Sequence, residues 1–380
     1  MSEGSYSFSP NTPPQTKPVS MPKTIFINGR FLTRPVTGVQ RYSLELIGEI
    51  DRQMGETPVP GDFHFVCLVP PEPIQHPGWR NVEIRRAGFN RGELWEQIDL
   101  PLHAGHDLLF SPANIGPWHY RNQVVTFHDA SVFAVPRSYS PLFRAKYRFV
   151  FRQLAGRARA ILTDTQFSRQ ELARYLDSDP ARFTVIAPGC DHLDRVQADI
   201  RTLERHGLQK DAYLLLVGGQ ASHKNLANVF TALQGLQTCP RIIVVGAAGG
   251  RAFRKQRTHR LPAQGEVLGY VDDMQLKALY ENALGLIFPS VYEGFGLPVL
   301  EAMRCGCPVL SSSSAALAEV AGRAALFFDP LDPQEISAAL HSFLSSPTLR
   351  EELRLKGQKR AAAFTWARAA SQLLDLLRQV

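Results

Sequence analysis

Residues 284–303, LGLIFPSVYEGFGLPVLEAM, decide the fold. The first five residues are apolar and typical of a short buried strand. Gly294 and Gly296 permit close backbone approach, and Pro298 fits the first turn of a helix. Free N–H groups at a helix N-terminus are suited to a phosphate. The stretch therefore predicts a strand, a loop that approaches an anion, and a helix.

Apolar runs alternate with helical patterns along the rest of the chain. This alternation predicts parallel sheets with helices on both faces. A less patterned stretch at 187–211 separates two halves, so we predict an α/β fold of two Rossmann-like, doubly wound domains facing a cleft. The expected strands are 24–28, 63–69, 107–110, 123–127, 160–164, 183–186, 213–217, 241–245, 284–288 and 308–312. The expected helices are 38–51, 141–160, 226–236 and 274–282, and one that opens with a capping box from Ser168 to Glu171.

The length of 380 residues and the 44% hydrophobic content suit two domains of ordinary size. Residues 1–22 are rich in Ser and Pro and are expected to form a disordered extension. We expect an N-terminal domain at 23–190, a linker at 191–210 and a second domain at 211–362. No apolar signal segment and no apolar run of about eighteen residues is found, so we expect a cytoplasmic protein.

The formal net charge of +7 favours a polyanionic partner. Residues 141–160, PLFRAKYRFVFRQLAGRARA, carry six Arg and Lys residues among aromatic and aliphatic side chains, and no acid. As a helix, this segment suits an anionic membrane surface, which would place the protein at the inner face of the cytoplasmic membrane. The alternative is a solvated helix that packs its aromatic side chains inward. No nucleic-acid module accompanies the charge, so no nucleic-acid partner is expected.

Neither a metal site nor a disulfide framework is predicted. Asp177 and Asp179 form a DxD pattern after a helix, which we interpret as a turn. His103, His106 and Asp107 lack a further partner at a recognisable spacing and are expected to end a helix. The cysteines form no CxxC pair and are expected to be reduced packing residues: Cys67, Cys190, Cys239, Cys305 and Cys307.

We call the loop that contains Gly294 and Gly296 the glycine loop. Two carboxylates, Glu293 and Glu301, flank this loop in the sequence. A carboxylate accepts two hydrogen bonds at once, as the vicinal hydroxyls of a sugar or ribose require. A phosphate between two polyols predicts a nucleotide sugar as the ligand. The alternative is that Glu293 is a surface loop residue and Glu301 a solvated helix residue.

Further candidate residues follow other strands. Gly218 and Gly219 follow the expected strand at 213–217 and, having no side chains, leave room for a ligand. Lys224 comes at the end of this loop, where a lysine is suited to neutralise a departing diphosphate. Taken alone, such a lysine is more often a solvated helix residue. In the first half, the N–H groups near Gly38 are suited to the same phosphate.

A histidine and an aspartate, His128 and Asp129, follow the expected strand at 123–127. A histidine at the carboxyl end of a strand is placed to contact a reacting sugar or to take a proton. The alternative is a histidine that merely bonds a loop carbonyl. Local sequence does not separate these two interpretations.

Three segments resemble one known family. VYEGFGLPVLEAMRCGCPVL at 291–310, GGQASHKN at 218–225 and FTWARAA at 364–370 are similar to retaining GT-B glycosyltransferases of family 4. INGRFLTRPVTGVQRY at 27–42 resembles members found in bacterial surface and exopolysaccharide assembly. The resemblance covers nearly the whole chain from about residue 23. It implies a GT-B fold in which the domain at 23–190 lies on the acceptor side and the domain at 211–362 binds the nucleotide sugar. A C-terminal helix at 363–380 would pack back on the N-terminal domain.

The resemblance also implies roles for the matching residues, with His128, Glu293 and Lys224 as the catalytic group. Glu293 would hold hydroxyls of the donor sugar, Lys224 the diphosphate and Glu301 the ribose, and His128 would contact the transferred sugar. The family often has Arg where this chain has Gly219, so another group is expected to supply charge. The remaining implied donor-binding residues are Gly38, Gly218, Gly219, Tyr270, Val271, Gly294, Phe295, Gly296 and Leu297, and the candidate supporting charges are Arg41, His223 and Asp129.

The reaction implied by the resemblance is transfer of a hexose with retention in bacterial polysaccharide biosynthesis. The donor would be GDP-mannose or a UDP-hexose, with mannose favoured by analogy, and no metal or other cofactor would be required. The acceptor would be a glycan or a polyprenyl-diphosphate-linked saccharide. Two alternatives stay open: a sugar-nucleotide epimerase of the same shape, and a non-catalytic protein that binds polysaccharide or another polyanion.

Overall fold

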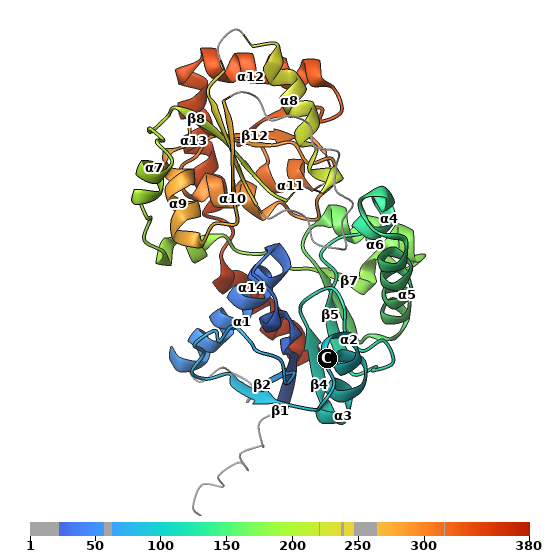
Figure 1. Cartoon of the computed structure of the whole chain (residues 1–380). Coiled ribbons are helices and arrows are strands. Elements are labelled where there is room, and N and C mark those ends of the chain that lie inside the picture. The colour runs from blue at the N-terminus through green and yellow to red at the C-terminus, as the bar shows by residue number, and fades with distance from the viewer. Residues whose placement is uncertain (1–22, 57–62, 220, 237–238, 247–263, 315) are drawn as a thin grey trace, which may run out of the picture.

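The computed structural model describes residues 23–380 except 57–62, 220, 237–238, 247–263 and 315. It has two lobes, one above the other in Figure 1, and each lobe is built on a parallel sheet. The predicted α/β fold of two doubly wound domains is therefore confirmed. The expected disordered extension at 1–22 lies outside the described residues.

The lower lobe in Figure 1 contains the N-terminal sheet, with strand order β3-β2-β1-β4-β5-β6-β7. Along β1, Ile25 and Ile27 join the core on one face and Phe26 joins the core on the other, as the two-residue period of a strand requires. The strands are β1 (Lys23–Asn28), β2 (Phe63–Val69), β3 (Glu83–Arg86), β4 (Leu108–Ser111), β5 (Gln123–Thr126), β6 (Ala160–Thr163) and β7 (Phe183–Val185).

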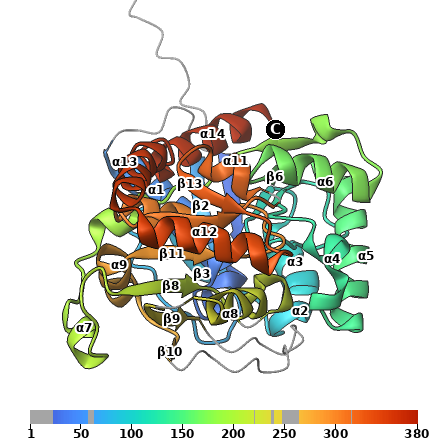
Figure 2. The ribbon, with the colours of Figure 1, turned by 90° about the horizontal axis from the view of Figure 1, so that it is seen from above.

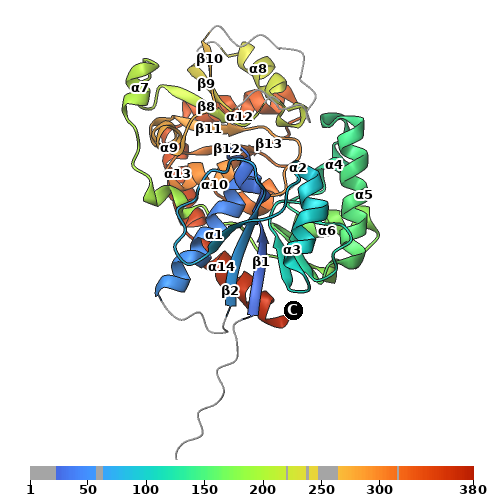
Figure 3. The same cartoon turned by 60° about the horizontal axis from the view of Figure 1, so that its bottom comes forward.

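Helices cover both faces of this sheet. On one face, α1 (Gly38–Glu56) packs beside α14 (Trp366–Gln379), so the last helix of the chain lies in the N-terminal lobe (Figure 3). The other face is covered by α3 (Leu100–Ala104) and the π-helical turn η2 (Trp95–Asp99). Beside them, three helices pack on β5–β7: α4 (Ser131–Ala134), α5 (Pro141–Arg157) and α6 (Gln166–Leu176).

The upper lobe contains a sheet with strand order β10-β9-β8-β11-β12-β13, whose first strands lie side by side in Figure 2. Its strands are β8 (Tyr213–Val217), β9 (Arg241–Val245), β10 (Gly265–Gly269), β11 (Gly285–Phe288), β12 (Val309–Ser312) and β13 (Ala325–Phe328). One face is covered by α7 (Arg201–Arg205), α9 (Asp273–Asn282), α10 (Leu297–Arg304) and α11 (Leu317–Ala321). The other face is covered by α8 (Leu226–Gln234), α12 (Pro333–Ser345) and α13 (Pro347–Ala361).

Several local predictions are wrong or incomplete. The predicted capping box at Ser168 is wrong, because Thr165 is the N-cap of α6 and its hydroxyl accepts the N–H of Ser168, which is buried. The helix expected at 38–51 extends to Glu56, and the one at 141–160 ends at Arg157. The sequence analysis missed β3, β10 and β13, which are short strands at sheet edges. The sequence of β3 is EIRR, and one apolar residue among four is too weak a pattern to predict a strand.

The chain passes between the lobes twice, and the two passages touch. Cys190 donates its N–H to the carbonyl of Phe364 at 3.1 Å. At Gly189, an added Cβ would come within 2.2 Å of the backbone nitrogen of Trp366. Only a glycine fits this crossing, so the paired passages hold the lobes at one edge.

A seam of hydrogen bonds joins the lobes at the glycine loop. The carbonyl of Gly294 accepts the hydroxyls of Thr165 at 2.9 Å and Ser168 at 3.1 Å. The carboxylate of Glu319 in α11 accepts the first N–H groups of α6 at 2.9 Å each, and so caps a helix of the other lobe. These contacts bring the two candidate loops, around Gly294 and His128, against each other.

Replacing Gly294 tests how tight this seam is. A Cβ at residue 294 would lie 2.2 Å from the carbonyl oxygen of His128, whereas a Cβ at Gly38 meets nothing within 4 Å. We expect Gly294→Ala to lower the free energy of unfolding by about 1–3 kcal/mol, because the loops must move apart. Gly38→Ala should change it by less than about 0.5 kcal/mol. Urea denaturation measures both, and equal stability of the two variants would contradict the tight seam.

Candidate active site

A cavity of about 680 Å³ lies between the lobes. It is lined by residues that follow strands of both sheets, where parallel sheets bind ligands. Every residue that the sequence analysis singled out for the site lies in this lining: Gly38, Arg41, His128, Asp129, Gly218, Gly219, His223, Lys224, Tyr270, Val271, Glu293, Gly294, Phe295, Gly296, Leu297 and Glu301.

The loop after β11 is shaped by Gly296, the N-cap of α10. Its φ of 90° belongs to the left-handed region that favours glycine, and an added Cβ would lie 2.3 Å from Leu317. Pro298 occupies the first turn of α10, as predicted. Glu293 therefore lies in the loop ahead of the helix N-terminus, and Glu301 lies one turn into the helix. The order strand, glycine loop, helix predicted from 284–303 is confirmed.

An ion pair between Lys224 and Glu293 crosses the upper part of the cavity. The Lys224 Nζ lies 2.6 Å from Glu293 Oε1, and both side chains are largely buried, with exposed fractions of 20% and 15%. Burial alone would raise the pKa of Glu293, but Lys224, His223 and Ser290 together outweigh burial, and the pKa is lowered. The carboxylate is therefore ionised at neutral pH, and the two charges neutralise each other.

The second carboxylate, Glu301, belongs to a buried relay that reaches the last helix. Trp366 donates its indole N–H to His192 Nδ1 at 3.3 Å, so the His192 proton is on Nε2, which lies 3.2 Å from Glu301 Oε1. Tyr280 donates its hydroxyl to Glu301 Oε2 at 3.1 Å. Burial raises the pKa of Glu301, but His192, Arg41 and Tyr280 together lower it below its ordinary value. The relay fixes both oxygens of this carboxylate.

The ring of His128 has a partner at each nitrogen. Nε2 lies 3.0 Å from the carbonyl of Pro112, which only accepts, so Nε2 carries a proton. Nδ1 lies 2.8 Å from Asp164 Oδ2, where a second proton is shared. Burial lowers the pKa of His128, but Asp164, Asp129 and the carbonyl of Pro112 together raise it, and the net direction is upward. The hydrogen bond to Pro112 corresponds to the alternative interpretation, a histidine that bonds a loop carbonyl. In this position the Nε2–H of His128 acts as a hydrogen-bond donor.

The other predicted side chains of the site differ in charge and in exposure. Arg41 forms ion pairs with Glu45 at 3.1 Å and with Asp273 of the other lobe. Burial and the neighbouring Lys224 lower the pKa of His223, which is therefore neutral at pH 7. Tyr270 is 60% exposed at the rim. Of the candidate supporting charges, Arg41 is thus the cation available at neutral pH.

The expected turns and thiols agree with the structure. Asp177 is a left-handed C-cap and Asp179 caps the 3-10 turn η4 (Pro180–Arg182), so the DxD pattern is a turn. The helix containing His103 ends at Ala104. All five cysteines are free thiols. Within the described residues, no group of three or more His, Cys, Asp or Glu side chains could hold a metal ion.

Three residues of the site were missed by the sequence analysis: Asp164, His192 and Tyr280. Each is a partner of a predicted residue but comes from a distant element. Asp164 is the last residue of the strand expected at 160–164, and it comes directly after β6 (Ala160–Thr163). A polar residue at the carboxyl end of a strand is the same signal that pointed to His128 after β5. His192 and Tyr280 lie in a crossing segment and inside a helix, and nothing in their local sequence distinguishes them.

Comparison with known proteins identifies the family. The model of the glycosyl transferases group 1 matches residues 200–360, and that of Glycosyltransferase Family 4 matches residues 36–192. The O-antigen chain mannosyltransferase B of Escherichia coli is 30% identical over 370 residues, covering 90% of this chain and 96% of the relative. The chain is thus a glycosyltransferase, and it belongs to family 4 of the GT-B fold.

Solved structures agree on the fold. Sucrose-phosphate synthase from Thermosynechococcus elongatus superposes with a TM-score of 0.74 at 18% identity, covering 94% of this chain and 98% of that one. Anabaena Alr3699/HepE in complex with UDP-glucose gives a TM-score of 0.71 at 16% identity, with coverage of 94% and 100%. The family favours a transferase over an epimerase or a non-catalytic binding protein, for which the curated relatives offer no support.

The lowered pKa of Glu301 predicts an acid dependence of stability. A carboxyl with a lowered folded pKa stabilises the fold fully above its ordinary value of 4.5, and this contribution is lost as the pH falls through the folded value. Each unit of lowering corresponds to about 1.4 kcal/mol. We expect Glu301→Gln to lose less stability than the parent chain between about pH 6 and pH 3. Urea titrations at each pH measure the free energy of unfolding. Glu352→Gln, on the exposed surface of α13, is the control and should follow the parent chain. An equal loss of stability in all three proteins would contradict the relay.

Proposed function

We propose that this protein transfers a hexose, mannose in our assignment, from a nucleotide sugar to a glycan or polyprenyl-diphosphate-linked acceptor. The transfer would proceed with retention and without a metal or other cofactor, in bacterial polysaccharide biosynthesis. The observation that carries the proposal is the convergence of the glycine loop, the Lys224–Glu293 pair and Glu301 on one cavity between the lobes.

Departure of the nucleoside diphosphate needs positive charge at the phosphates and hydrogen bonds at the sugar. We assign the diphosphate to Lys224 and to the N–H groups at the start of α10, beside Phe295, Gly296 and Leu297. Lys224 is paired with Glu293 at 2.6 Å. A bound diphosphate would take over the lysine, and Glu293 would turn to hydroxyls of the donor sugar. Donor binding would then break the Lys224–Glu293 pair, and the same step would place Lys224 on the leaving diphosphate and Glu293 on the sugar.

The remaining roles follow from the contacts of each group. Glu301 has both oxygens ordered by the relay and is assigned to the ribose. Arg41, which reaches Asp273 across the cleft, is assigned the supporting charge that an arginine at residue 219 would otherwise supply. His128 carries a proton on Nε2, so we assign it as a hydrogen-bond donor to the transferred sugar in exchange for Pro112. The proton of the acceptor hydroxyl would leave with the diphosphate.

The assignment of mannose rests on relatives. The serotype-specific mannosyltransferase WbdA of Escherichia coli is 31% identical over 281 residues, which cover 70% of this chain and 34% of that protein. Together with the O-antigen chain mannosyltransferase B, it favours mannose and hence GDP-mannose as the donor. The UDP-glucose complex of Alr3699/HepE keeps UDP-hexoses as the alternative donors.

A donor panel tests this proposal. We expect GDP-mannose or a UDP-hexose to raise the melting temperature of the parent chain and to be consumed with an acceptor glycan. Lys224→Met should abolish the thermal shift and lower turnover at least about 100-fold. Without the lysine, no cation at this residue stabilises the negative charge that develops on the departing diphosphate. Lys356→Met, the same change on the exposed surface of α13, should behave like the parent chain.

Two results would contradict the proposal. One is a parent chain whose melting temperature no nucleotide sugar changes. The other is formation of a new isomer of the donor in the absence of acceptor, which would identify an epimerase.

We further propose that α5 rests on an anionic membrane surface. Its aromatic residues Tyr147 and Phe151 pack inward, but Leu142 is 83% exposed and Phe149 is 49% exposed. Arginines lie on the same helix, which gives the mixture of cations and apolar side chains that binds anionic headgroups. None of the helices in the described ranges is long and apolar enough to span a bilayer.

Liposome sedimentation tests the membrane proposal. We expect binding to anionic vesicles and none to neutral vesicles. Leu142→Ser/Phe149→Ser should weaken binding by about tenfold, since two exposed apolar side chains contribute roughly 1–2 kcal/mol. Leu355→Ser, on an exposed site of α13 in the other lobe, is the matched control. Equal binding to both vesicle types, or none to either, would rule the proposal out.

A further inference from the structure

The ring of His128 rests against a buried carboxylate, that of Asp164. The two residues follow β5 and β6, which are neighbouring parallel strands, so the carboxyl ends of these strands bring their side chains together. Asp164 Oδ2 lies 2.8 Å from His128 Nδ1, and the side chains are 5% and 10% exposed. The other oxygen, Asp164 Oδ1, is buried and accepts no hydrogen bond from any residue that the structure describes. His128 is thus the partner on which this carboxylate depends.

The groups that face the pair in the described part of the chain are anionic or neutral. Asp129, next to His128, adds a second negative charge that acts on both members of the pair. Tyr42 of α1 places its ring edge-on against the imidazole, with centroids 4.6 Å apart. Burial and Asp164 raise the pKa of Tyr42, so its hydroxyl stays neutral. At the remaining nitrogen of the imidazole, the carbonyl of Pro112 accepts. The charge of Asp164 is therefore balanced by His128.

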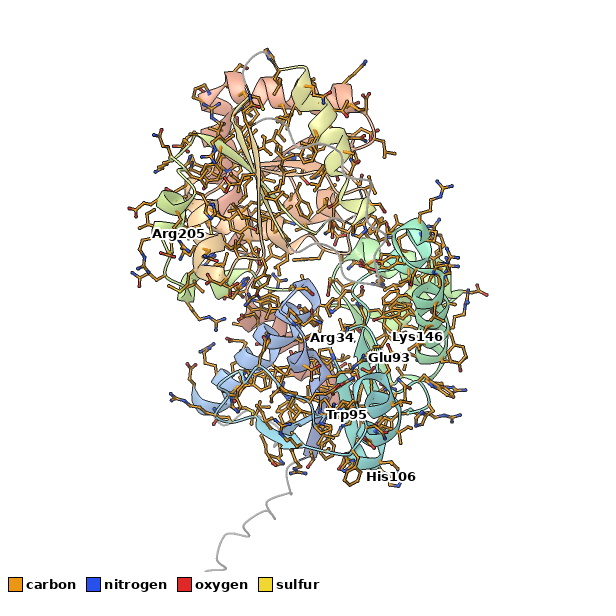
Figure 4. All side chains as sticks on the ribbon, viewed as in Figure 1. Arg34, Glu93, Trp95, His106, Lys146 and Arg205 are labelled. Carbon is orange, nitrogen blue, oxygen red and sulfur yellow. The ribbon has the colours of Figure 1, made fainter. Side chains whose placement is uncertain are left out.

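An exposed ion pair of the same lobe provides a contrast. Lys146 of α5 pairs with Glu93 of α2 (Gly92–Leu94), close together in Figure 4, and their exposed fractions are 34% and 50%. Water screens such a pair, so the loss of one partner costs little. A buried carboxylate that loses its partner is strongly destabilised. Burial raises the pKa of Asp164, and although burial lowers the pKa of His128, the acceptors around the ring raise it more. Both directions oppose loss of the proton that the pair shares.

The shared proton decides what the imidazole can donate. A neutral imidazole without a fixed partner carries its proton on either nitrogen, so Nε2 is a donor only part of the time. Here Asp164 accepts at Nδ1 and Pro112 accepts at Nε2, so both nitrogens keep a proton. The positive charge of that ring is cancelled by Asp164. Departure of a diphosphate leaves positive charge on the sugar, and a neutral pair can donate a hydrogen bond there without opposing that charge.

We propose that Asp164 is a positioning residue of the transferase, which holds His128 in one orientation with Nε2–H as a permanent donor and cancels the charge of the ring. The inference rests on the proposed function, because it assumes that His128 donates to the transferred sugar. It adds a residue that acts through His128 and comes from a different strand. The ring keeps both protons through the range near pH 6.5 in which histidines ordinarily titrate.

Nitrogen NMR of the histidine side chains tests the state of the ring directly. In the parent chain without donor, we expect both ring nitrogens of His128 to stay protonated from about pH 6 to about pH 8. His128→Gln identifies the signal, and His341, exposed on α12, is the internal reference. Asp164→Asn should leave one nitrogen of His128 unprotonated at about pH 8, because an amide does not balance the positive charge. Glu93→Gln, which removes the exposed carboxylate, should leave the ring as it is in the parent chain.

Turnover tests what the pair does in the reaction. We expect kcat of the parent chain and of Glu93→Gln to be level between about pH 6 and about pH 8. Asp164→Asn should lower kcat about tenfold at the upper end of this range, and less at the lower end. A deleted donor costs roughly 100-fold, but the neutral ring still carries its proton on Nε2 part of the time. A carboxylate with a structural role alone would change the melting temperature and leave the shape of the pH profile unchanged.

The outcomes separate this inference from the proposed function. The affinities for GDP and UDP should be the same in the parent chain and both carboxylate variants. A His128 ring that loses a proton near pH 6.5 in the parent chain would overturn the inference, and this spectrum decides even where Asp164→Asn does not fold. An Asp164→Asn chain whose ring and pH profile match the parent chain would also overturn it and leave the transferase intact. A parent chain that keeps both ring protons but binds neither nucleotide would instead contradict the proposed function.

Discussion

The ion pair between Lys224 and Glu293 is the constraint on which the cleft depends. A cavity between two lobes that collects a lysine, three arginines and several carboxylates is stable only if each buried charge has a partner. The protein meets this requirement with its own side chains: Lys224 pairs with Glu293, and Arg41 pairs with Asp273. The same requirement makes the site selective, because a ligand must offer an anion to the lysine and hydroxyls to the carboxylate at once.

The lobes are held so that Arg41 of the N-terminal lobe pairs with Asp273 across the cleft, while Lys224 and Glu293 pair within the C-terminal lobe. The two crossing passages touch at Gly189 and Trp366, and the seam at Gly294 fixes the opposite loops against each other. Trp366 also begins the relay through His192 to Glu301, so the last helix is linked to a carboxylate of the site. The fold thus couples the packing of α14 on the N-terminal lobe to the geometry of the C-terminal lobe.

The sequence predicted the fold and the lining of the cavity because both depend on local patterns. Apolar strands, the glycine loop and the residues at strand ends are visible in order along the chain, and all of the predicted site residues line one cavity. Pairings between distant elements were not visible. The contacts of His128 with Pro112 and Asp164, and of Glu301 with His192, depend on three-dimensional neighbours. The capping box at Ser168 failed because Thr165 offered the same chemistry three residues earlier.

The most direct test of this account is a crystal structure with the donor nucleotide bound. The account predicts that Lys224 Nζ leaves Glu293 and lies about 3 Å from a phosphate oxygen, while a Glu293 oxygen lies at a similar distance from a sugar hydroxyl. A nucleotide bound in the cleft with the Lys224–Glu293 pair still at 2.6 Å, or a nucleotide bound elsewhere, would contradict it.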